Sequence, residues 1–259
     1  MSGKEAVVSG HTTSNLFTHT ITYGGTRNYT VCYNPDALTT YWVAYPLNSS
    51  YMGSAGRNEE WAYVDSDLLP TNKQVNVVDG SFYSWYNNKE DKGTNNYSKG
   101  HLVPSNSRTS SVGMNKQTFL SVNIAPQHQN SFNGGVWNAL EGKLQTLATT
   151  QQLFIVTGTM CQSVGDGFST SDTYDTSGKQ IPAPRYFYKV VLKVDNANNP
   201  TSASAIGFWY TNEAHTGNYN DANYVKSVDQ IEQWTGLDFF VNLPDSIENA
   251  AEKMTTPWW

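Results

Sequence analysis

The sequence NYSKGHLVPSNSR, residues 96–108, places one histidine between a glycine and a polar turn. Gly100 would let the backbone approach a ligand closely, Lys99 adds a positive charge, and Pro104 begins a run that would end a strand. A histidine such as His101 has a pKa near neutrality and can act as a general base. A motif this short also occurs by chance, so taken alone it favours a structural histidine.

A second segment, FLSVNIAPQHQNSFNGGVWNALE at residues 119–141, changes that balance. It predicts a strand that ends at Asn123, a turn over 126–130, and an amphipathic helix that begins near Asn133. Together with the strand that carries His101, these elements would form a compact ββα unit. Asn133 and Glu141 would lie along one flank of the helix, where an amide oxygen and a carboxylate could face a common site. Oxygen ligands without a cysteine or histidine cluster suit a hydrated Mg²⁺ rather than zinc.

The wider pattern predicts an α+β fold with a mostly antiparallel central sheet and flanking helices. Residues 17–48 are rich in Thr, Tyr and Val and contain Gly-Gly and Asn-Pro-Asp turns, which indicates three strands. Residues 133–149 carry apolar side chains at helical spacing, and residues 79–100 have the composition of a surface loop. Further strands are expected at 152–159, 185–194 and 203–211, and a late helix is expected between Ser227 and Gly236.

Composition limits the possible partners. The 259 residues are 38% hydrophobic and 15% charged, with a formal net charge of -6, so a polyanion would have to be held by local positive groups or a metal ion. No apolar run approaches the roughly 20 residues that a membrane span requires.

We expect residues 1–15 to be a flexible segment and residues 16–259 to form a single domain. Cys32 and Cys161 fit either one disulfide or two thiols.

Three segments together resemble the DNA/RNA non-specific endonuclease family of the ββα-metal, or His-Me finger, superfamily. They are YSKGHLVPS at 97–105, FLSVNIAPQ at 119–127 and FNGGVWNALE at 132–141. The similarity extends more loosely over residues 41–245. It implies a ββα-metal finger active site and metal-dependent hydrolysis of DNA and RNA to 5′-phosphate ends, with recognition through the phosphate backbone.

Carried onto this sequence, the resemblance implies a role for each of five residues. His101 would be the general base, Asn133 the direct protein ligand to Mg²⁺, with Mn²⁺ as a substitute, and Glu141 a ligand through water. Asn123 would support the catalytic site, and Arg57 would stabilise the charged phosphate. Asn130 competes with Asn133 as the metal ligand if the turn carries an insertion, but FNGGVWNALE keeps Asn133 in register with Glu141.

The sequence departs from the family at two positions. Ser98 and Lys99 stand where members usually carry aspartate and arginine. Lys99 keeps the positive charge but lacks the planar fork of arginine, so phosphate contact would be altered. Lys99 and Arg108 are the expected substrate-binding cations, and Arg108 fits equally well as a surface residue at the end of a turn.

Two other readings stay open at this level. The 8 Trp and 16 Tyr would suit a secreted carbohydrate-binding or adhesion module, although aromatic side chains more often fill sheet faces. The changes at Ser98 and Lys99 would also fit a nuclease homologue with impaired catalysis. The resemblance further implies export to the periplasm, surface or exterior, with a signal outside this sequence, and the oligomeric state stays open.

Overall fold

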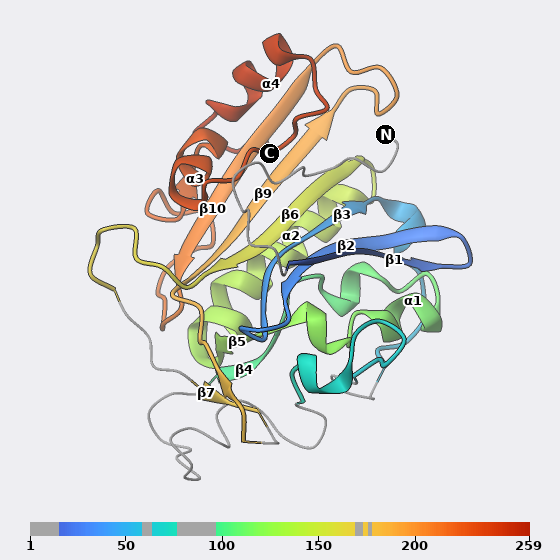
Figure 1. The fold of residues 1–259 in the computed structure, drawn as a ribbon. Helices are drawn as coiled ribbons and strands as arrows, with labels where there is room; N and C mark the ends of the chain where they lie inside the picture. The colour runs from blue at the N-terminus through green and yellow to red at the C-terminus, as the bar shows by residue number, and fades with distance from the viewer. Residues whose placement is uncertain (1–15, 59–63, 77–96, 169–172, 176–177) are drawn as a thin grey trace.

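An antiparallel sheet forms the centre of the molecule (Figure 1). The computed structural model describes residues 16–58, 64–76, 97–168, 173–175 and 178–259. The sheet has seven strands in the order β1-β2-β3-β6-β9-β10-β11, and every neighbouring pair is antiparallel. Its strands are β1 (Phe17–Tyr23), β2 (Thr26–Asn34), β3 (Thr39–Leu47), β6 (Leu153–Met160), β9 (Tyr186–Val194), β10 (Ala203–Thr211) and β11 (Val225–Lys226).

The predicted α+β class is confirmed, with helices on both faces of this sheet. Two small sheets pair β4 (Tyr97–His101) with β5 (Ile124–His128) and β7 (Thr173–Tyr174) with β8 (Gln180–Ile181). The helices are α1 (Val112–Gln117), α2 (Asn138–Ala148), α3 (Val228–Thr235) and α4 (Asp245–Glu252), with an irregular helical segment η6 (Gln129–Trp137) before α2. Short 3-10 turns are η1 (Ser49–Tyr51), η2 (Thr71–Lys73), η4 (Ser105–Ser107) and η5 (Ser121–Asn123).

Alternation along β9 separates two hydrophobic cores. Phe187 and Val191 pack on the face covered by α2, whereas Tyr188, Val190 and Leu192 pack on the face covered by α3 and α4. Successive side chains of a strand point to opposite faces, so a strand buried on both sides is apolar throughout. Lys189 is the exception in the middle of β9, and it lies on the α2 face with Phe187 and Val191.

The predicted late helix is confirmed with both of its ends. The Ser227 hydroxyl accepts a hydrogen bond from the backbone amide of Gln230 at the start of α3. Gly236 closes the helix with a φ of 70°, a left-handed conformation that costs glycine little. The capping pattern in the sequence was therefore sufficient to place this element.

Three local expectations are wrong. The strand predicted to end at Asn123 instead starts at Ile124, because the Asn123 side chain occupies the preceding turn. The turn predicted over 126–130 does not begin at Pro126, which lies inside β5. A two-stranded sheet leaves one edge of each strand without a partner, so proline is tolerated there although it has no amide N–H. The helix predicted from Asn133 is interrupted at Gly135, whose φ and ψ of -116° and -113° are not helical.

Other expectations fall partly outside the described residues. The predicted flexible segment 1–15 lies outside them, as do residues 79–96 of the predicted loop. The last part of that loop, residues 97–100, is not loop but belongs to β4. Cys32 and Cys161 are free thiols in the structure.

The aromatic side chains mostly fill the sheet faces. Trp42, Trp137 and Tyr186 are essentially buried, and Trp209 is 7% exposed between helix α3 and the sheet. Among the residues that the structure describes, Tyr23 is the exposed large aromatic. Within the part of the chain that the structure describes, this distribution does not provide the exposed aromatic platform that the carbohydrate-binding alternative needs.

Arg108 is a core residue, which corrects the expectation that it contacts substrate. It has no exposed surface, and it stacks over the rings of Tyr45 and Tyr51. Its guanidinium donates to the side-chain oxygen and carbonyl of Asn28 and to the carbonyls of Pro46 and Ser107. The group therefore ties the chain after the histidine motif to strands β2 and β3.

Replacing Arg108 with methionine should destabilise the protein by about 3 kcal/mol or more, since it leaves several buried carbonyl oxygens without donors. Urea unfolding followed by circular dichroism measures this loss. Lys143→Met on α2 is the control for a loss of positive charge and should change stability little. Equal stabilities for the two variants would contradict the assignment of Arg108 to the core.

Candidate active site

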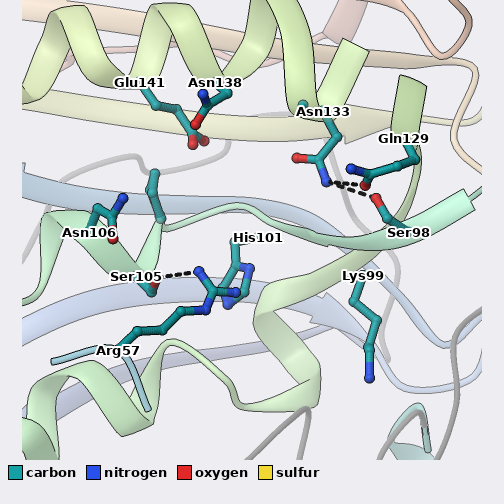
Figure 2. Close-up of a pocket in the computed structure, with 12 residues that line it drawn as sticks. Arg57, Ser98, Lys99, His101, Ser105, Asn106, Gln129, Asn133, Asn138 and Glu141 are labelled. Atoms are coloured by element: carbon teal, nitrogen blue, oxygen red, sulfur yellow. Dashed lines mark hydrogen bonds between the residues drawn. The ribbon is translucent and has the colours of Figure 1, made fainter. Parts of the chain in front are cut away.

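A pocket of about 570 Å³ lies between β4, the turn that follows it, and the η6–α2 segment. Figure 2 shows side chains from these elements directed toward a common space. Of the predicted site residues, Arg57, Lys99, His101, Asn133 and Glu141 line the pocket, whereas Asn123 and Arg108 do not. The full lining is Arg57, Ser98, Lys99, His101, Pro104, Ser105, Asn106, Gln129, Asn133, Gly134, Asn138 and Glu141.

His101 is the last residue of β4, and it is partly buried. The edge of its ring meets Phe119, with centroids 4.8 Å apart and an interplanar angle of 85°. Burial, together with the positive charges of Arg57 and Lys99, lowers the pKa of His101 to about 3. The imidazole is therefore neutral at ordinary pH, which is the form that can accept a proton.

The Arg57 guanidinium lies beside the histidine. Its Nη1 donates a hydrogen bond of 2.8 Å to the Ser105 hydroxyl, and its Cζ lies 5.1 Å from the centre of the Phe119 ring. Phe119 thus contacts both His101 and Arg57 and fixes one side of the pocket. Lys99 also lines the pocket, but its side chain extends away from Asn133 and Glu141 (Figure 2).

Asn133 is oriented by two acceptors on its amide nitrogen. Nδ2 donates to Ser98 Oγ at 2.7 Å and to Gln129 Oε1 at 3.1 Å. Ser98 Oγ in turn donates to the carbonyl of Gln127 at 3.0 Å, so the hydroxyl has a fixed direction. The Asn133 amide oxygen is consequently turned into the pocket (Figure 2).

Asn130, the competing candidate, is directed elsewhere. It is exposed and does not line the pocket. Its carbonyl accepts hydrogen bonds from the Ser131 hydroxyl and lies 3.0 Å from His128 Nδ1. The geometry therefore favours Asn133 as the residue that faces the site.

The Glu141 side chain extends from α2 into the pocket and forms an ion pair with Lys189 of β9. Lys189 Nζ lies 3.4 Å from Glu141 Oε1, 3.0 Å from Thr157 Oγ1 and 4.0 Å from the centre of the Trp137 ring. At 3.4 Å the contact between Lys189 and Glu141 is an ion pair rather than a well-directed hydrogen bond, since Glu141 Oε1 has no hydrogen-bond donor of good geometry. Burial raises the pKa of Glu141 and lowers that of Lys189 to about 8, and their mutual attraction opposes both shifts.

Gly100 is needed for packing between the two strands. A Cβ at this position would lie 2.4 Å from Gln127 Oε1 and 3.1 Å from the carbonyl oxygen of Ala125. Its φ is not in the left-handed region, so backbone freedom is not the reason for glycine. The expected close approach to a ligand is replaced by a close approach to the neighbouring strand β5.

The donor set suits a hydrated hard cation. The oxygens available on this wall come from the amide of Asn133, the carboxylate of Glu141 and the amide of Asn138. Few oxygen ligands leave room for several water molecules, which Mg²⁺ releases reluctantly. A separate carboxylate cluster, made by Asp229, Glu232 and Glu252, lies on α3 and α4 and is not part of this pocket.

Comparison with known proteins identifies the fold and the family. The family model described as DNA/RNA non-specific endonuclease matches residues 12–246. The chain belongs to this family. It is a member of a family of nucleases, which are hydrolases that act on nucleic acid.

Individual relatives agree with the family match. A nuclease of Nostoc sp. is 30% identical over 232 residues, covering 87% of this chain and 76% of the relative. The human mitochondrial nuclease EXOG is 28% identical over 222 residues, covering 83% of this chain and 56% of its own length. The structure described as the EndoG/EndoGI complex shares the fold, with a TM-score of 0.64, 18% identity and 89% coverage of each chain.

The names of some relatives include a compartment. The human relative and nucleases of Saccharomyces cerevisiae and Schizosaccharomyces pombe are named as mitochondrial. The expected export is therefore not supported by these names. None of the described helices is both long and apolar enough to cross a membrane.

Several residues at or beneath this pocket were missed by the sequence analysis. Lys189 had a visible signal, a lysine in the middle of the apolar strand YFYKVVLKV. Ser105, Gln129 and Asn138 had none, because polar residues in turns and on helix surfaces are common. Their place in the site depends on the packing of η6 and α2 against β4.

The low pKa of His101 predicts that its ring stays neutral over the range in which an ordinary imidazole gains a proton. In the metal-free protein, the NMR signals of His101 should not titrate between pH 8 and pH 5, because protonation requires a pH near 3. His101→Gln assigns the signals by their loss. A midpoint near 6.5, the usual value for histidine, would contradict the burial and charge argument.

Proposed function

We propose that this protein is a divalent-metal-dependent endonuclease that hydrolyses both DNA and RNA and leaves 5′-phosphate ends. The observation that carries the proposal is the arrangement around one pocket of a neutral histidine, a guanidinium and an inward-facing amide oxygen beside a carboxylate. Phosphodiester hydrolysis requires an activated water molecule, compensation of negative charge on the phosphate, and stabilisation of the leaving oxygen. The pocket offers a group for each requirement.

His101 is the proposed general base. Its neutral imidazole takes the proton from the attacking water, and Phe119 holds the ring at the end of β4. Arg57 is held by Ser105 and Phe119 and contributes a positive charge to the non-bridging phosphate oxygens. General-base catalysis of this kind contributes roughly 10² to 10⁴ in rate.

The inward-facing oxygens of Asn133 and Glu141 would hold Mg²⁺, Asn133 directly and Glu141 through water, with Mn²⁺ as a substitute. Bound there, the ion supplies Lewis-acid stabilisation of the phosphate and of the leaving oxygen. Lys189 favours the ionised form of Glu141, and Ser98 fixes the direction of the Asn133 amide. Asn123 acts outside the pocket by holding the chain that follows His101.

Recognition of the phosphate backbone accounts for an acidic protein that binds nucleic acid. The net charge is -6, but Arg57 and Lys99 both line the pocket. Contacts to phosphate position the substrate without reading bases, so little sequence preference is expected. DNA and RNA share this backbone chemistry, which supports action on both.

The wild-type protein should degrade plasmid DNA and RNA with Mg²⁺ and lose this activity with chelator. His101→Ala should reduce cleavage by about 10² or more, because the base is lost. His19→Ala, which changes an exposed histidine on β1, is the control. The DNA fragments should be ligatable without prior phosphorylation, as 5′-phosphate ends require.

Full activity of His101→Ala with normal folding would exclude this histidine as the base. Absence of metal-dependent cleavage in the wild type would instead support the impaired-homologue reading. Fragments that require phosphorylation before ligation would contradict the proposed end chemistry.

Ser98→Ala should raise the Mg²⁺ concentration needed for half-maximal activity by about tenfold, since Asn133 loses the nearer of the two acceptors that orient it. Ser98→Asp is the matched variant, because a carboxylate also accepts the Asn133 amide, and it should require less Mg²⁺ than Ser98→Ala. Magnesium titrations of initial cleavage rates measure both. The same Mg²⁺ dependence in Ser98→Ala and wild type would show that the hydroxyl does not position Asn133.

A further inference from the structure

Three carboxylates meet on the face of the sheet opposite the pocket. Asp229 and Glu232 belong to α3, and Glu252 is the last residue of α4 (Figure 1). One carboxylate oxygen from each residue can be chosen so that all three lie within 4.8 Å of one another. Both helices pack on the core that includes Tyr188 and Val190, whereas α2 packs on the other core.

Glu252 is an unusual member of this cluster because it is buried. Glu252 is only 6% exposed, and its Oε1 has no hydrogen-bond partner. Glu248, one turn earlier on α4, also has a buried Oε1 without a partner. A carboxylate removed from water without a donor or cation is unfavourable, so something must compensate these oxygens.

Among the described residues, few groups compensate these carboxylates, and none is a cation in an ion pair with them. Glu232 Oε1 accepts one hydrogen bond of 2.7 Å from the backbone amide of Phe239. The ion pairs found among the described residues, Lys73–Asp36 and Lys189–Glu141, lie elsewhere. Besides this backbone donor, Glu232 shares a side-chain hydrogen bond with Glu252, which requires a proton on one of the two carboxyl groups.

Burial and mutual repulsion raise the pKa values of two carboxyl groups on α4, those of Glu248 and Glu252. Burial, together with repulsion by Glu232, Glu248 and Asp229, raises the pKa of Glu252 to about 9. Burial raises the pKa of Glu248 to about 7, and neighbouring acidic groups act in the same direction. The close approach of the three carboxylates and the unpartnered Oε1 of Glu252 are relieved by either bound protons or a bound cation.

The spacing and the chemistry favour a calcium ion. Calcium binds oxygen ligands at about 2.3 to 2.6 Å, so oxygens on opposite sides of the ion lie about 5 Å apart. Three oxygens within 4.8 Å of one another fit on such a sphere. Several carboxylates with flexible denticity suit calcium better than magnesium, which keeps its waters and demands a regular octahedron.

We propose that Asp229, Glu232 and Glu252 form a Ca²⁺ site, separate from the pocket around His101, in which the ion joins α3 to α4. The site neutralises the buried Glu252 and fixes the C-terminal helices on the sheet. Its proposed effect is on stability, so it stands independently of the nuclease mechanism.

Thermal unfolding of the full chain, with CaCl₂ or with chelator, tests the proposal. The Asn133→Ala background is used throughout, so that binding in the His101 pocket does not contribute. Calcium at about 100 times its Kd should raise Tm by about 5 °C. Glu252→Gln should abolish this shift, whereas Glu213→Gln, an exposed control, should retain it.

Direct binding provides a second readout that does not depend on the size of the Tm shift. Terbium is a luminescent substitute for calcium, and Trp234 on α3 is an available sensitiser. Luminescence that is displaced by Ca²⁺ and lost in Asp229→Asn supports the site. The absence of any calcium-dependent change in Tm or luminescence would overturn the proposal. Equal responses with Glu252 intact and with Glu252→Gln would also overturn it. Protonated carboxyl groups would then explain the cluster.

Discussion

The active-site geometry depends on the buried side chain of Asn123. Its Oδ1 accepts a hydrogen bond from the Val103 amide, and its Nδ2 donates to the carbonyls of Val103 and Thr118. Its own carbonyl accepts from the amide of Leu102. These buried hydrogen bonds connect the segment that follows His101 to the segment that precedes β5. Loss of such a buried network leaves several backbone groups without partners, which is costly.

Local charge then defines what this scaffold can do. Lys189 projects from the sheet beneath Glu141, and Arg57 lies on the other side of the pocket beside His101. Burial and the positive charges of Arg57 and Lys99 keep His101 neutral, and the positive charge of Lys189 favours the ionised form of Glu141. An acidic protein thereby obtains a pocket with the electrostatic properties that phosphate chemistry requires, without a broad basic surface. Ser98 has a local role as well, since its hydroxyl accepts a hydrogen bond from the Asn133 amide.

The sequence was informative where local signals coincide with tertiary structure. The first three strands, the helix closed by Ser227 and Gly236, and the pairing of the histidine strand with a second strand followed from periodicity and capping. The His101 pocket and its main lining residues followed from the family resemblance, as expected for motifs that carry chemistry. Lys189 could have been suspected from its position in an apolar strand.

Other features could not be read locally because long-range packing determines them. The burial of Arg108 depends on Asn28 and Pro46, which are far away in the sequence. The kink at Gly135 interrupts a pattern whose apolar spacing is otherwise regular. Gly100 suggested a ligand contact, but the neighbouring side chain of Gln127 is what excludes a Cβ. In each case the residue type was visible and its partner was not.

The fold turns the amide oxygen of Asn133, rather than that of Asn130, into the pocket opposite His101. The most direct test compares magnesium-dependent cleavage of DNA by Asn133→Ala and Asn130→Ala, with folding verified by circular dichroism. The account predicts that Asn133→Ala loses about 10² or more in activity, in line with the loss of a metal ligand, while Asn130→Ala stays close to wild type. Near-normal cleavage by Asn133→Ala together with a severe loss in Asn130→Ala would contradict it.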